Sequence, residues 1–218
     1  FSAAIYAYCA DADSVTIWKD VPGMLNADPK WFDNTVKLDK ISFKEAIELS
    51  YYGATVIHPK TIKPLQNKGI ELHVKSFIDP NAPGTTIQAS GNFDHLVPSF
   101  IFKMDQVLMS FTPKDFSFIV EQNLGDIFQS LAQQGVKINL MKNSALSFSI
   151  LFDRSKIDPM QLVDLFKSQY EVRYNEGLEL VTIRHYDQAT IDRVSVNKDI
   201  LVEQRTRQTI RMVMKDLG

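Results

Sequence analysis

The sequence predicts an α/β first half, from residue 1 to about residue 90, followed by an α+β second half. Helical and strand patterns alternate through the first half, as they do in α/β domains. The second half shows the order strand, helix, strand, strand, helix, strand, which describes a ferredoxin-like unit. Between them, the segment DPNAPGTTIQASGNFD, residues 79–94, is rich in Pro, Gly, Asn and Ser, so we place the domain boundary there.

The first half opens on FSAAIYAYCA, a helical pattern that begins without a start methionine or a capping residue. We therefore expect the chain to be a fragment of a longer protein. A β-rich run, SVTIW, follows and ends near Trp18. Farther along, Ser42 and Glu45 form a capping box at the start of a helix that Gly53 ends. A second helix is expected from residue 59 to residue 67.

The second half carries clear strand and helix signals. Apolar residues occupy every second position from Leu146 to Phe152, which is the pattern of a strand with one buried face. Asp158 followed by Pro159 is typical of a helix start. From such patterns we predict strands at residues 107–111, 136–141, 146–152 and 170–174, and helices at about 117–134 and 158–168.

Composition excludes several classes of partner. The chain has 218 residues, of which 44% are hydrophobic and 23% charged, and a formal net charge of −2 with both signs interspersed. A nucleic-acid or anionic-membrane partner is therefore not expected. The single Cys9 rules out an internal disulfide, and no apolar run reaches the roughly 20 residues that span a bilayer. A reducing cytoplasm is the expected setting.

A charged pair, Lys19 and Asp20, follows the strand that ends near Trp18, and Pro22 and Gly23 then turn the chain. Ligands of open α/β sheets bind beyond the carboxyl ends of the strands. Lys19 could therefore place an ammonium group on phosphate oxygens, and Asp20 could accept a hydrogen bond from a ribose hydroxyl or an adenine amine. On spacing alone, a solvated charge pair in a turn is the simpler interpretation.

Two motifs resemble the nucleotide-binding half of aspartokinases, which phosphorylate the side-chain carboxylate of aspartate from ATP. They are IWKDVPGMLNADPK, residues 17–30, and YYGATVIHPKTIKPL, residues 51–65. The resemblance implies the C-terminal part of a three-layer amino-acid kinase domain over residues 1–90, with ATP and Mg²⁺ as cofactors. It also implies that the nucleotide contacts Lys19, Asp20, Leu25, Lys30, Thr55 and Val56. Thr55 stands where many relatives carry lysine, and we infer that Lys19 partly replaces that charge.

The resemblance further implies transfer of the γ-phosphoryl group of ATP to the β-carboxylate of aspartate, in lysine, threonine and methionine biosynthesis. That carboxylate is already ionised near pH 7 and needs no general base. We therefore interpret His58 as a residue that starts the helix at Pro59, and not as a catalytic group. Family members also carry KFGG-type and GGSD-type segments that this chain lacks. We expect the chain to hold half of the ATP site, no catalytic residue, and no kinase activity of its own.

The second half resembles the ACT domains of aspartokinases, which sense end-product amino acids, in FTPKDFSFI, VKINLMKNSALSFSI and YNEGLELVTIRHYDQATIDRV. The resemblance implies a first ACT domain at residues 97–176 and a second, reduced unit at residues 177–218. The second unit would contain strands at 178–184, 200–204 and 209–213, a helix at 190–194, and a strand borrowed from 99–103. A homodimer is expected, through a sheet edge and the apolar helix faces around Ile127, Phe128 and Leu131.

The expected effector site lacks the two carboxylates that lysine-inhibited relatives carry, because Asn139 and Ala145 stand at those positions. Asn139, Asn143 and Ser144 could bind the α-groups of an amino acid, but they carry no negative charge to pair with the side-chain ammonium of lysine. Three acidic residues could restore a charge, although exposed positions are their simpler interpretation: Asp115, Glu121 and Asp126. We predict that lysine does not bind in the usual way, and that a smaller effector such as threonine, or none, acts instead.

Two alternatives remain open at this point. One is a self-standing amino-acid-binding ACT module without catalysis. The other is a different amino-acid kinase, which acts on glutamate or on a nucleotide. The nearly complete nucleotide loop disfavours the first alternative, and the ACT-like second half disfavours the second.

Overall fold

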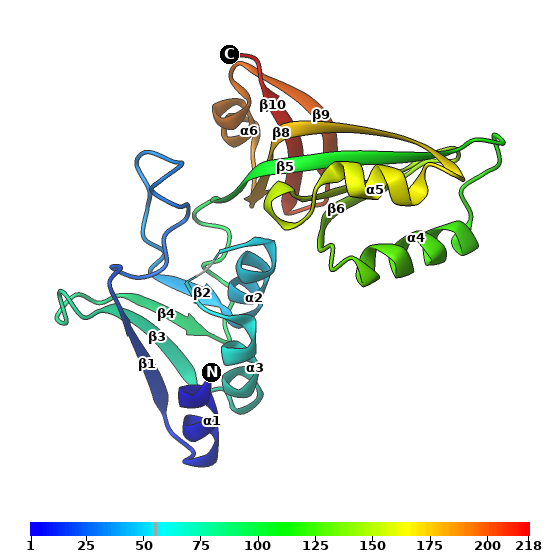
Figure 1. Cartoon of the computed structure of the whole chain (residues 1–218). Helices are drawn as coiled ribbons and strands as arrows, with labels where there is room; N and C mark the ends of the chain where they lie inside the picture. Colours follow the sequence, from blue (N-terminus) through cyan, green and yellow to red (C-terminus); the bar gives the residue numbers. More distant parts are fainter. Residues whose placement is uncertain (55) are drawn as a thin grey trace. The chain divides into compact units, whose positions relative to one another are not determined.

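The computed structural model describes residues 1–54 and 56–218 (Figure 1). The first part of the chain contains α1 (Ser2–Cys9), β1 (Ser14–Lys19), β2 (Lys40–Ser42), α2 (Phe43–Tyr52), α3 (Pro59–Lys68), β3 (Glu71–Ser76) and β4 (Thr85–Gln88). The elements that follow are β5 (Ser99–Pro113), α4 (Glu121–Gln133), β6 (Ile138–Asn143), β7 (Phe148–Asp153), α5 (Pro159–Phe166), β8 (Tyr170–Arg184), α6 (Gln188–Ser195), β9 (Lys198–Arg205) and β10 (Thr209–Asp216). A 3-10 turn, Arg154–Lys156, precedes α5.

The first sheet has the strand order β1-β3-β4-β2. β1 is parallel to β3, β3 is antiparallel to β4, and β4 is parallel to β2. Helices α1, α2 and α3 lie along one side of this sheet (Figure 1). They share one core with the strands, which includes Ala4, Leu49, Leu65, Leu72 and Ile87. The first part of the chain is therefore mixed α/β, as predicted.

The helix ends in this part follow the predicted signals. Ser42 Oγ accepts a hydrogen bond from Glu45 N at 2.9 Å and begins α2. Gly53 ends α2 with a φ of 133°. His58 Nδ1 accepts from Lys60 N at 3.1 Å at the start of α3. The interpretation of His58 as a helix-starting residue is therefore confirmed.

The second sheet has the strand order β6-β7-β5-β8-β10-β9. The predicted order of strand, helix, strand, strand, helix, strand is confirmed by β5, α4, β6, β7, α5 and β8. Helices α4 and α5 share a core with the strands, in which Ile127, Leu131 and Leu162 pack with Met109 and Ile150. Ile127 and Leu131 are fully buried in that core. The expectation that the side chains of Ile127 and Leu131 form a dimer interface is therefore wrong, whereas Phe128 is 37% exposed and its place in such an interface stays a prediction.

Two strands are longer than predicted. β5 joins the predicted strands 99–103 and 107–111, and β8 joins those at 170–174 and 178–184. Each contains one residue with positive φ at the expected break: Asp105 with a φ of 52° and Gly177 with a φ of 67°. A left-handed residue interrupts the alternation of side chains, as in a β-bulge, while the strand continues. The break in the sequence pattern therefore marks an irregular residue and not a strand end.

The segment 79–94 is not a linker throughout, because β4 lies inside it. Thr85 and Ile87 are fully buried, and β4 pairs with both β3 and β2. Four residues with buried side chains at alternate positions form a complete strand of this sheet. The surrounding Pro, Gly and Asn residues concealed that short pattern in the sequence.

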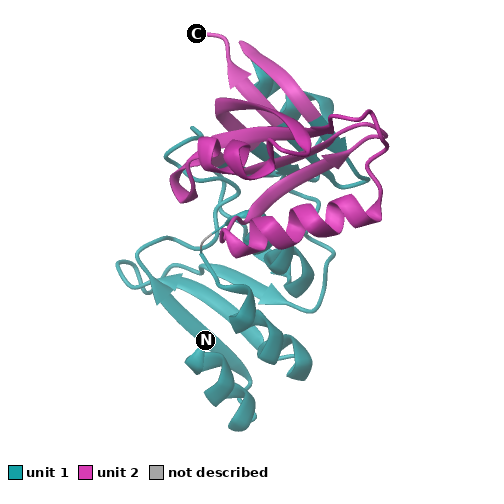
Figure 2. Cartoon of the chain, turned by 45° about the vertical axis from the view of Figure 1, so that its right-hand side comes forward, with its two compact units in different colours: residues 1–102, 181–196, 203–212 teal, residues 103–180, 197–202, 213–218 magenta. Residues whose placement is uncertain are grey.

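The chain divides into two compact units (Figure 2). Unit 1 contains residues 1–102, 181–196 and 203–212, and unit 2 contains residues 103–180, 197–202 and 213–218. The division falls within β5, β8, β9 and β10, and not in the segment 79–94. The domain boundaries expected from the sequence remain a prediction. The cavity described below belongs to unit 1, and the predicted effector residues belong to unit 2.

Candidate functional site

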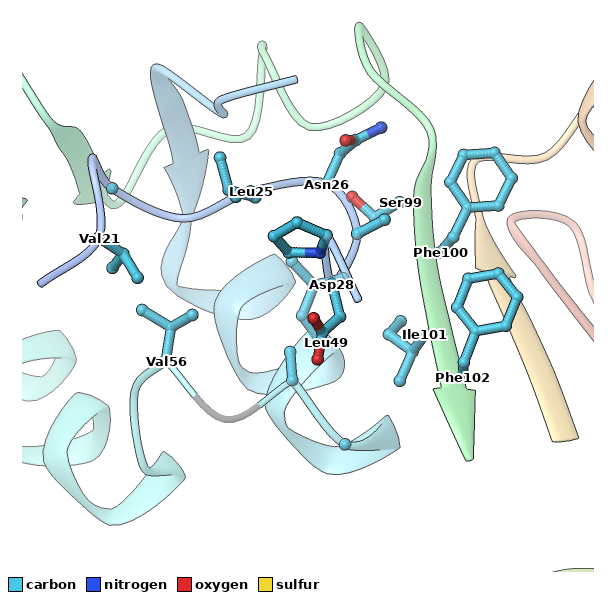
Figure 3. A pocket seen from close by; sticks show the side chains of 15 residues that line it. Val21, Leu25, Asn26, Asp28, Leu49, Val56, Ser99, Phe100, Ile101 and Phe102 are labelled. Carbon is cyan, nitrogen blue, oxygen red and sulfur yellow. The ribbon is translucent and has the colours of Figure 1, made fainter. Parts of the chain in front are cut away.

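Unit 1 contains a cavity of ≈ 390 Å³. Its walls come from the loop after β1, the C-terminal end of α2 with the segment that follows, and the start of β5 (Figure 3). The lining combines apolar side chains with a few polar ones and includes Val21, Leu25, Leu49, Val56, Ile101, Asn26, Asp28 and Ser99. Such a mixture suits a small ligand that is largely apolar and carries a few polar groups.

Gly23 allows the loop after β1 to lie against β4. Its φ is 150°, and a Cβ atom at this position would lie 2.5 Å from Thr85 Oγ1. The same hydroxyl accepts from Met24 N at 2.8 Å and donates to Leu38 O at 2.6 Å. Only glycine takes this conformation in this space without displacing a neighbour. The loop is therefore fixed to the sheet at the point where it begins to line the cavity.

Asn26 organises the rest of the loop. Its Nδ2 donates to Pro98 O at 2.9 Å, and its Oδ1 accepts from Val36 N at 2.7 Å. Its backbone oxygen accepts from Phe100 N at 2.6 Å. One buried side chain thus joins the loop to itself and to the start of β5. Sequence reasoning missed Asn26, because its side-chain partners lie 10 and 72 residues away and give no local pattern.

Two of the predicted nucleotide residues line the cavity, and a third is hydrogen-bonded to one of them. Leu25 and Val56 line it. Lys19, the last residue of β1, donates from Nζ to Val56 O at 2.9 Å. Because Lys19 and Val56 come from the two different motifs, this hydrogen bond brings both motifs to one wall.

The remaining predicted residues lie at the rim or beyond it. Lys30 is exposed and directly follows Asp28 and Pro29, which line the cavity. Its backbone N–H donates to Asp28 Oδ1 at 2.9 Å, which fixes the turn that presents Lys30. Asp20 is exposed next to Lys19. Thr55 lies outside the described residues.

The predicted effector residue Asn139 is held within the second sheet. It lies at a register shift between Ile138 and Leu140. Its Nδ2 donates to Gln106 Oε1 at 2.8 Å, and its Oδ1 accepts from Lys103 Nζ at 2.7 Å. These bonds tie the bulge in β6 to β5.

Asn143 and Ser144 lie at the other end of β6, where the chain turns toward β7, and both are exposed. Ser144 N donates to Ser147 O at 2.8 Å across this turn. Ile119 N donates to Ala145 O at 3.0 Å, so the turn lies beside the segment that joins β5 to α4. Asn143 and Ser144 therefore lie near the strand-helix junction, while Asn139 lies about 13 Å away along the strand.

The three acidic residues considered as substitutes for the missing carboxylates are exposed: Asp115, Glu121 and Asp126. Asp115 Oδ1 accepts from Ser117 N at 3.0 Å. Hydrogen bonds from the side chain and backbone of Ser117 hold the pKa of the Asp115 carboxyl below its ordinary value. The simpler interpretation of these residues, as exposed positions, is confirmed.

Residues 1–54 and 56–218 contain no group of three or more His, Cys, Asp or Glu side chains that could hold a metal ion. In the same described part of the chain, no helix has the length and apolar composition needed to cross a membrane. A cation at the cavity would therefore need ligands other than such a cluster.

Comparison with known proteins assigns the family. Residues 1–76 match the model of the amino acid kinase family. The chain is 30% identical over 178 residues to the bifunctional aspartokinase/homoserine dehydrogenase of Buchnera aphidicola, and the match covers 82% of this chain and 22% of that relative. It is 28% identical over 191 residues to lysine-sensitive aspartokinase 3 of Escherichia coli, which covers 84% of this chain and 42% of that relative. The chain belongs to the aspartokinase family.

Solved aspartokinase structures share its fold. The structure of Clostridium acetobutylicum aspartate kinase matches with a TM-score of 0.84 at 22% identity, over 98% of this chain and 54% of that chain. E. coli aspartokinase III in complex with aspartate and ADP matches with a TM-score of 0.76 at 24% identity, over 99% of this chain and 52% of that chain. The chain thus spans 22% and 42% of the two curated aspartokinases and about half of these two solved chains.

Proposed function

We propose that this chain is the part of an aspartokinase that carries one half of the ATP site and the regulatory region. The complete enzyme transfers the γ-phosphoryl group of ATP to the β-carboxylate of aspartate, in lysine, threonine and methionine biosynthesis. The hydrogen bond from Lys19 Nζ to Val56 O, at 2.9 Å, is the observation that carries the proposal. It joins the two motifs of the family at the wall of a cavity.

The cavity suits the nucleoside part of ATP. Its volume of ≈ 390 Å³ falls within the range of about 300–1,000 Å³ that is usual for small-ligand sites. Val21, Leu25 and Val56 offer apolar side chains to the faces of an adenine ring. Asp20, exposed at the end of β1, offers a carboxylate to a ribose hydroxyl.

The two lysines suit the phosphate groups. Lys30 is exposed at the rim, and in this proposal Lys19 exchanges its bond with Val56 O for a charge-assisted bond to a phosphate oxygen. Bound ATP supplies the phosphoryl group that is transferred, and Mg²⁺ held by phosphate oxygens neutralises their charge. The residues of this chain would orient the nucleotide and add positive charge.

No residue of the chain is proposed as a general base. The β-carboxylate of aspartate is ionised near pH 7 and can attack phosphorus without losing a proton. Catalysis then depends on positioning and on charge. Because the chain carries half of the ATP site in this proposal, it should bind nucleotide weakly and release no ADP from ATP and aspartate.

Residues 97–218 are proposed to form two ACT units. In the order β6-β7-β5-β8, the first and last strands of a β-α-β-β-α-β unit lie side by side in the sheet, which supports a ferredoxin-like first unit. The order β9-β10-β8-β5 has the same arrangement. Here β8 is the first strand of the second unit, and β5 is the borrowed strand that takes the place of the last. Two such units would share the long strands β5 and β8.

An amino-acid effector is proposed to bind near Asn143 and Ser144. These exposed polar side chains and the neighbouring backbone can serve the α-groups of an amino acid. Asn139 would act from farther along β6, through its bonds with Gln106 and Lys103. None of the three carries the negative charge that a lysine ammonium needs, so threonine, or no effector, is proposed.

A homodimer is proposed to form at the edge of the second sheet. β6 is an outer strand of that sheet, and unpaired strand edges favour pairing with a second copy. Three large apolar side chains, Phe116, Phe118 and Leu146, are 84%, 67% and 46% exposed. The bond between Ile119 N and Ala145 O brings their two segments together.

The proposed activity is tested with the complete enzyme. ADP release should require aspartate, and glutamate should not replace it. Equilibrium binding of magnesium-ADP to the present chain tests the half-site: weak binding with no turnover supports the proposal. If neither the complete enzyme nor the present chain binds nucleotide, but an amino acid binds, a self-standing sensory module is favoured instead.

A further inference from the structure

Arg193, on α6, contacts the loop that lines the cavity. Its guanidinium carbon lies 3.9 Å from the centre of the Phe32 ring. Its Nη2 also donates to Asp33 O at 2.9 Å. A guanidinium over an aromatic face with a hydrogen bond to the adjacent carbonyl holds one point of the loop in two ways. The contact joins residues that are 160 positions apart in the sequence.

Phe32 connects Arg193 to the cavity wall, because it packs against a residue that lines the cavity. Its ring is buried and stacks on Phe100, with 4.3 Å between the ring centres. Phe100 lines the cavity, and its N–H donates to Asn26 O at 2.6 Å (Figure 3). A displacement of Phe32 would therefore move both the loop wall and the wall formed by the start of β5.

The opposite wall is tied to the same C-terminal segment. Glu45, in the first turn of α2, accepts two hydrogen bonds from Arg184 at the end of β8. Arg184 Nη1 also donates to Thr209 Oγ1 at 2.7 Å. The far end of α2 contributes Leu49 to the cavity. Because Arg184 lies four residues before the first residue of α6, α2 and α6 are joined through a buried anchor.

These contacts link the two walls of the cavity in one series, which runs from α2 through Arg184, α6, Arg193 and Phe32 to the loop. We propose that Arg193 is a positioning residue for the nucleotide, because it completes this series of contacts and thereby sets the distance between the two walls. The inference rests on the proposed function for the identity of the ligand. The series of contacts itself is a property of unit 1 and can be tested without any ligand.

Three variants of the present chain test this series of contacts by hydrogen exchange. Arg193→Ala removes both contacts, Arg193→Lys keeps a cation near the Phe32 ring but loses the planar guanidinium, and Arg205→Ala is a matched control. Arg205 is an exposed arginine of the same unit whose Nε donates to Glu203. The amides of Asn26 and Leu38 report on the loop, since they donate to Val36 O and Met24 O.

Arg193→Ala should speed exchange of the loop amides about tenfold, from the loss of a cation-π contact and one hydrogen bond. Exchange in α2 should stay unchanged, Arg193→Lys should lie between, and Arg205→Ala should match the wild type. Unchanged loop exchange in Arg193→Ala would overturn the proposal. An equal increase in α2 and the loop would also overturn it, since that result indicates general destabilisation.

Function is measured on the complete enzyme with the same three substitutions. Arg193→Ala should raise the KM for ATP several-fold and change kcat less, because the loop is mispositioned but still present. A lower kcat at unchanged KM would contradict a positioning role. If the wild-type enzyme shows no ATP-dependent activity, the proposed function fails, whereas the exchange experiment still decides whether Arg193 holds the loop.

Discussion

Arg184 holds Glu45 by two hydrogen bonds, from Nε to Oε1 at 3.0 Å and from Nη2 to Oε2 at 2.5 Å. The two side chains are 6% and 4% exposed. Burial tends to raise the pKa of the Glu45 carboxyl, but the contacts with His185 and Arg184 outweigh it and hold that pKa below its ordinary value of 4.5. Paired charges in this setting depend strongly on each other, since either one alone would be buried without a partner.

Glu45→Gln should therefore destabilise the protein in a pH-dependent way. Near neutral pH, loss of the carboxylate leaves the Arg184 guanidinium buried without the opposite charge of Glu45, at a cost of about 3 kcal/mol in the free energy of unfolding. The folded-state pKa of Glu45 is lowered, so the stabilisation is present above pH 4.5 and is lost as pH falls through the folded-state pKa. Urea unfolding at several pH values should show the wild type approaching the variant in acid. A constant difference across that range would contradict the assignment.

The same carboxylate shows where a local sequence pattern is overridden. Ser42 and Glu45 match a capping box, and Ser42 does cap the helix. The return bond is made by Asp94, whose Oδ1 accepts from Ser42 N at 2.7 Å. Glu45 binds a guanidinium instead, because a charge-assisted pair of hydrogen bonds is stronger than one bond to a backbone N–H. Arg184 is 139 residues away, so no local pattern could have revealed it.

Lys30→Ala should weaken ATP binding by the complete enzyme. Loss of a charge-assisted phosphate contact corresponds to about 1.5–3 kcal/mol, or roughly a ten- to hundredfold rise in the KM for ATP. Lys63→Ala removes an exposed lysine of α3 and serves as the control. An unchanged KM in Lys30→Ala would remove Lys30 from the site without affecting the family assignment.

Gly23→Ala should destabilise the loop after β1. A side chain is disfavoured at a φ of 150°, and its Cβ would lie 2.5 Å from Thr85 Oγ1. The expected loss is about 1–3 kcal/mol in the free energy of unfolding. Gly125→Ala is the matched control, because no atom lies within 4 Å of a Cβ added there, within α4. That change should instead stabilise the protein by about 0.5–1 kcal/mol, and equal effects of the two substitutions would contradict this account.

The sequence predicted most of the elements and less of the site. Period-two patterns and capping residues located α2, α3, β7 and α5, because those signals are local. Lys19 and Val56 were predicted from the family motifs, and the structure brings them within a hydrogen bond. Asn26, Phe32 and Arg193 were missed, since their roles arise from contacts between distant segments. The continuous β5 and β8 were missed because one left-handed residue broke each pattern.

Phe118→Asp should convert the proposed homodimer to a monomer. A carboxylate in an apolar interface would be desolvated without a partner. Phe77→Asp changes an aromatic side chain of unit 1 that is 59% exposed, and should leave the association unchanged. Sedimentation of the present chain at several concentrations measures both variants. A wild-type chain that stays monomeric at high micromolar concentration would contradict the dimer proposal.

Effector binding should distinguish the two ends of β6. Calorimetric titration is expected to show no micromolar binding of lysine, because Asn139, Asn143 and Ser144 offer no negative charge to its ammonium. If threonine binds, Ser144→Ala should weaken threonine binding about three- to tenfold, through the loss of one hydrogen bond.

Asn139→Ala should act mainly on stability, by about 1–3 kcal/mol in the free energy of unfolding, because it leaves the fully buried side chain of Gln106 short of a partner. Micromolar lysine binding that Asn139→Ala abolishes would show that the effector site extends along β6 and that the charge argument is wrong.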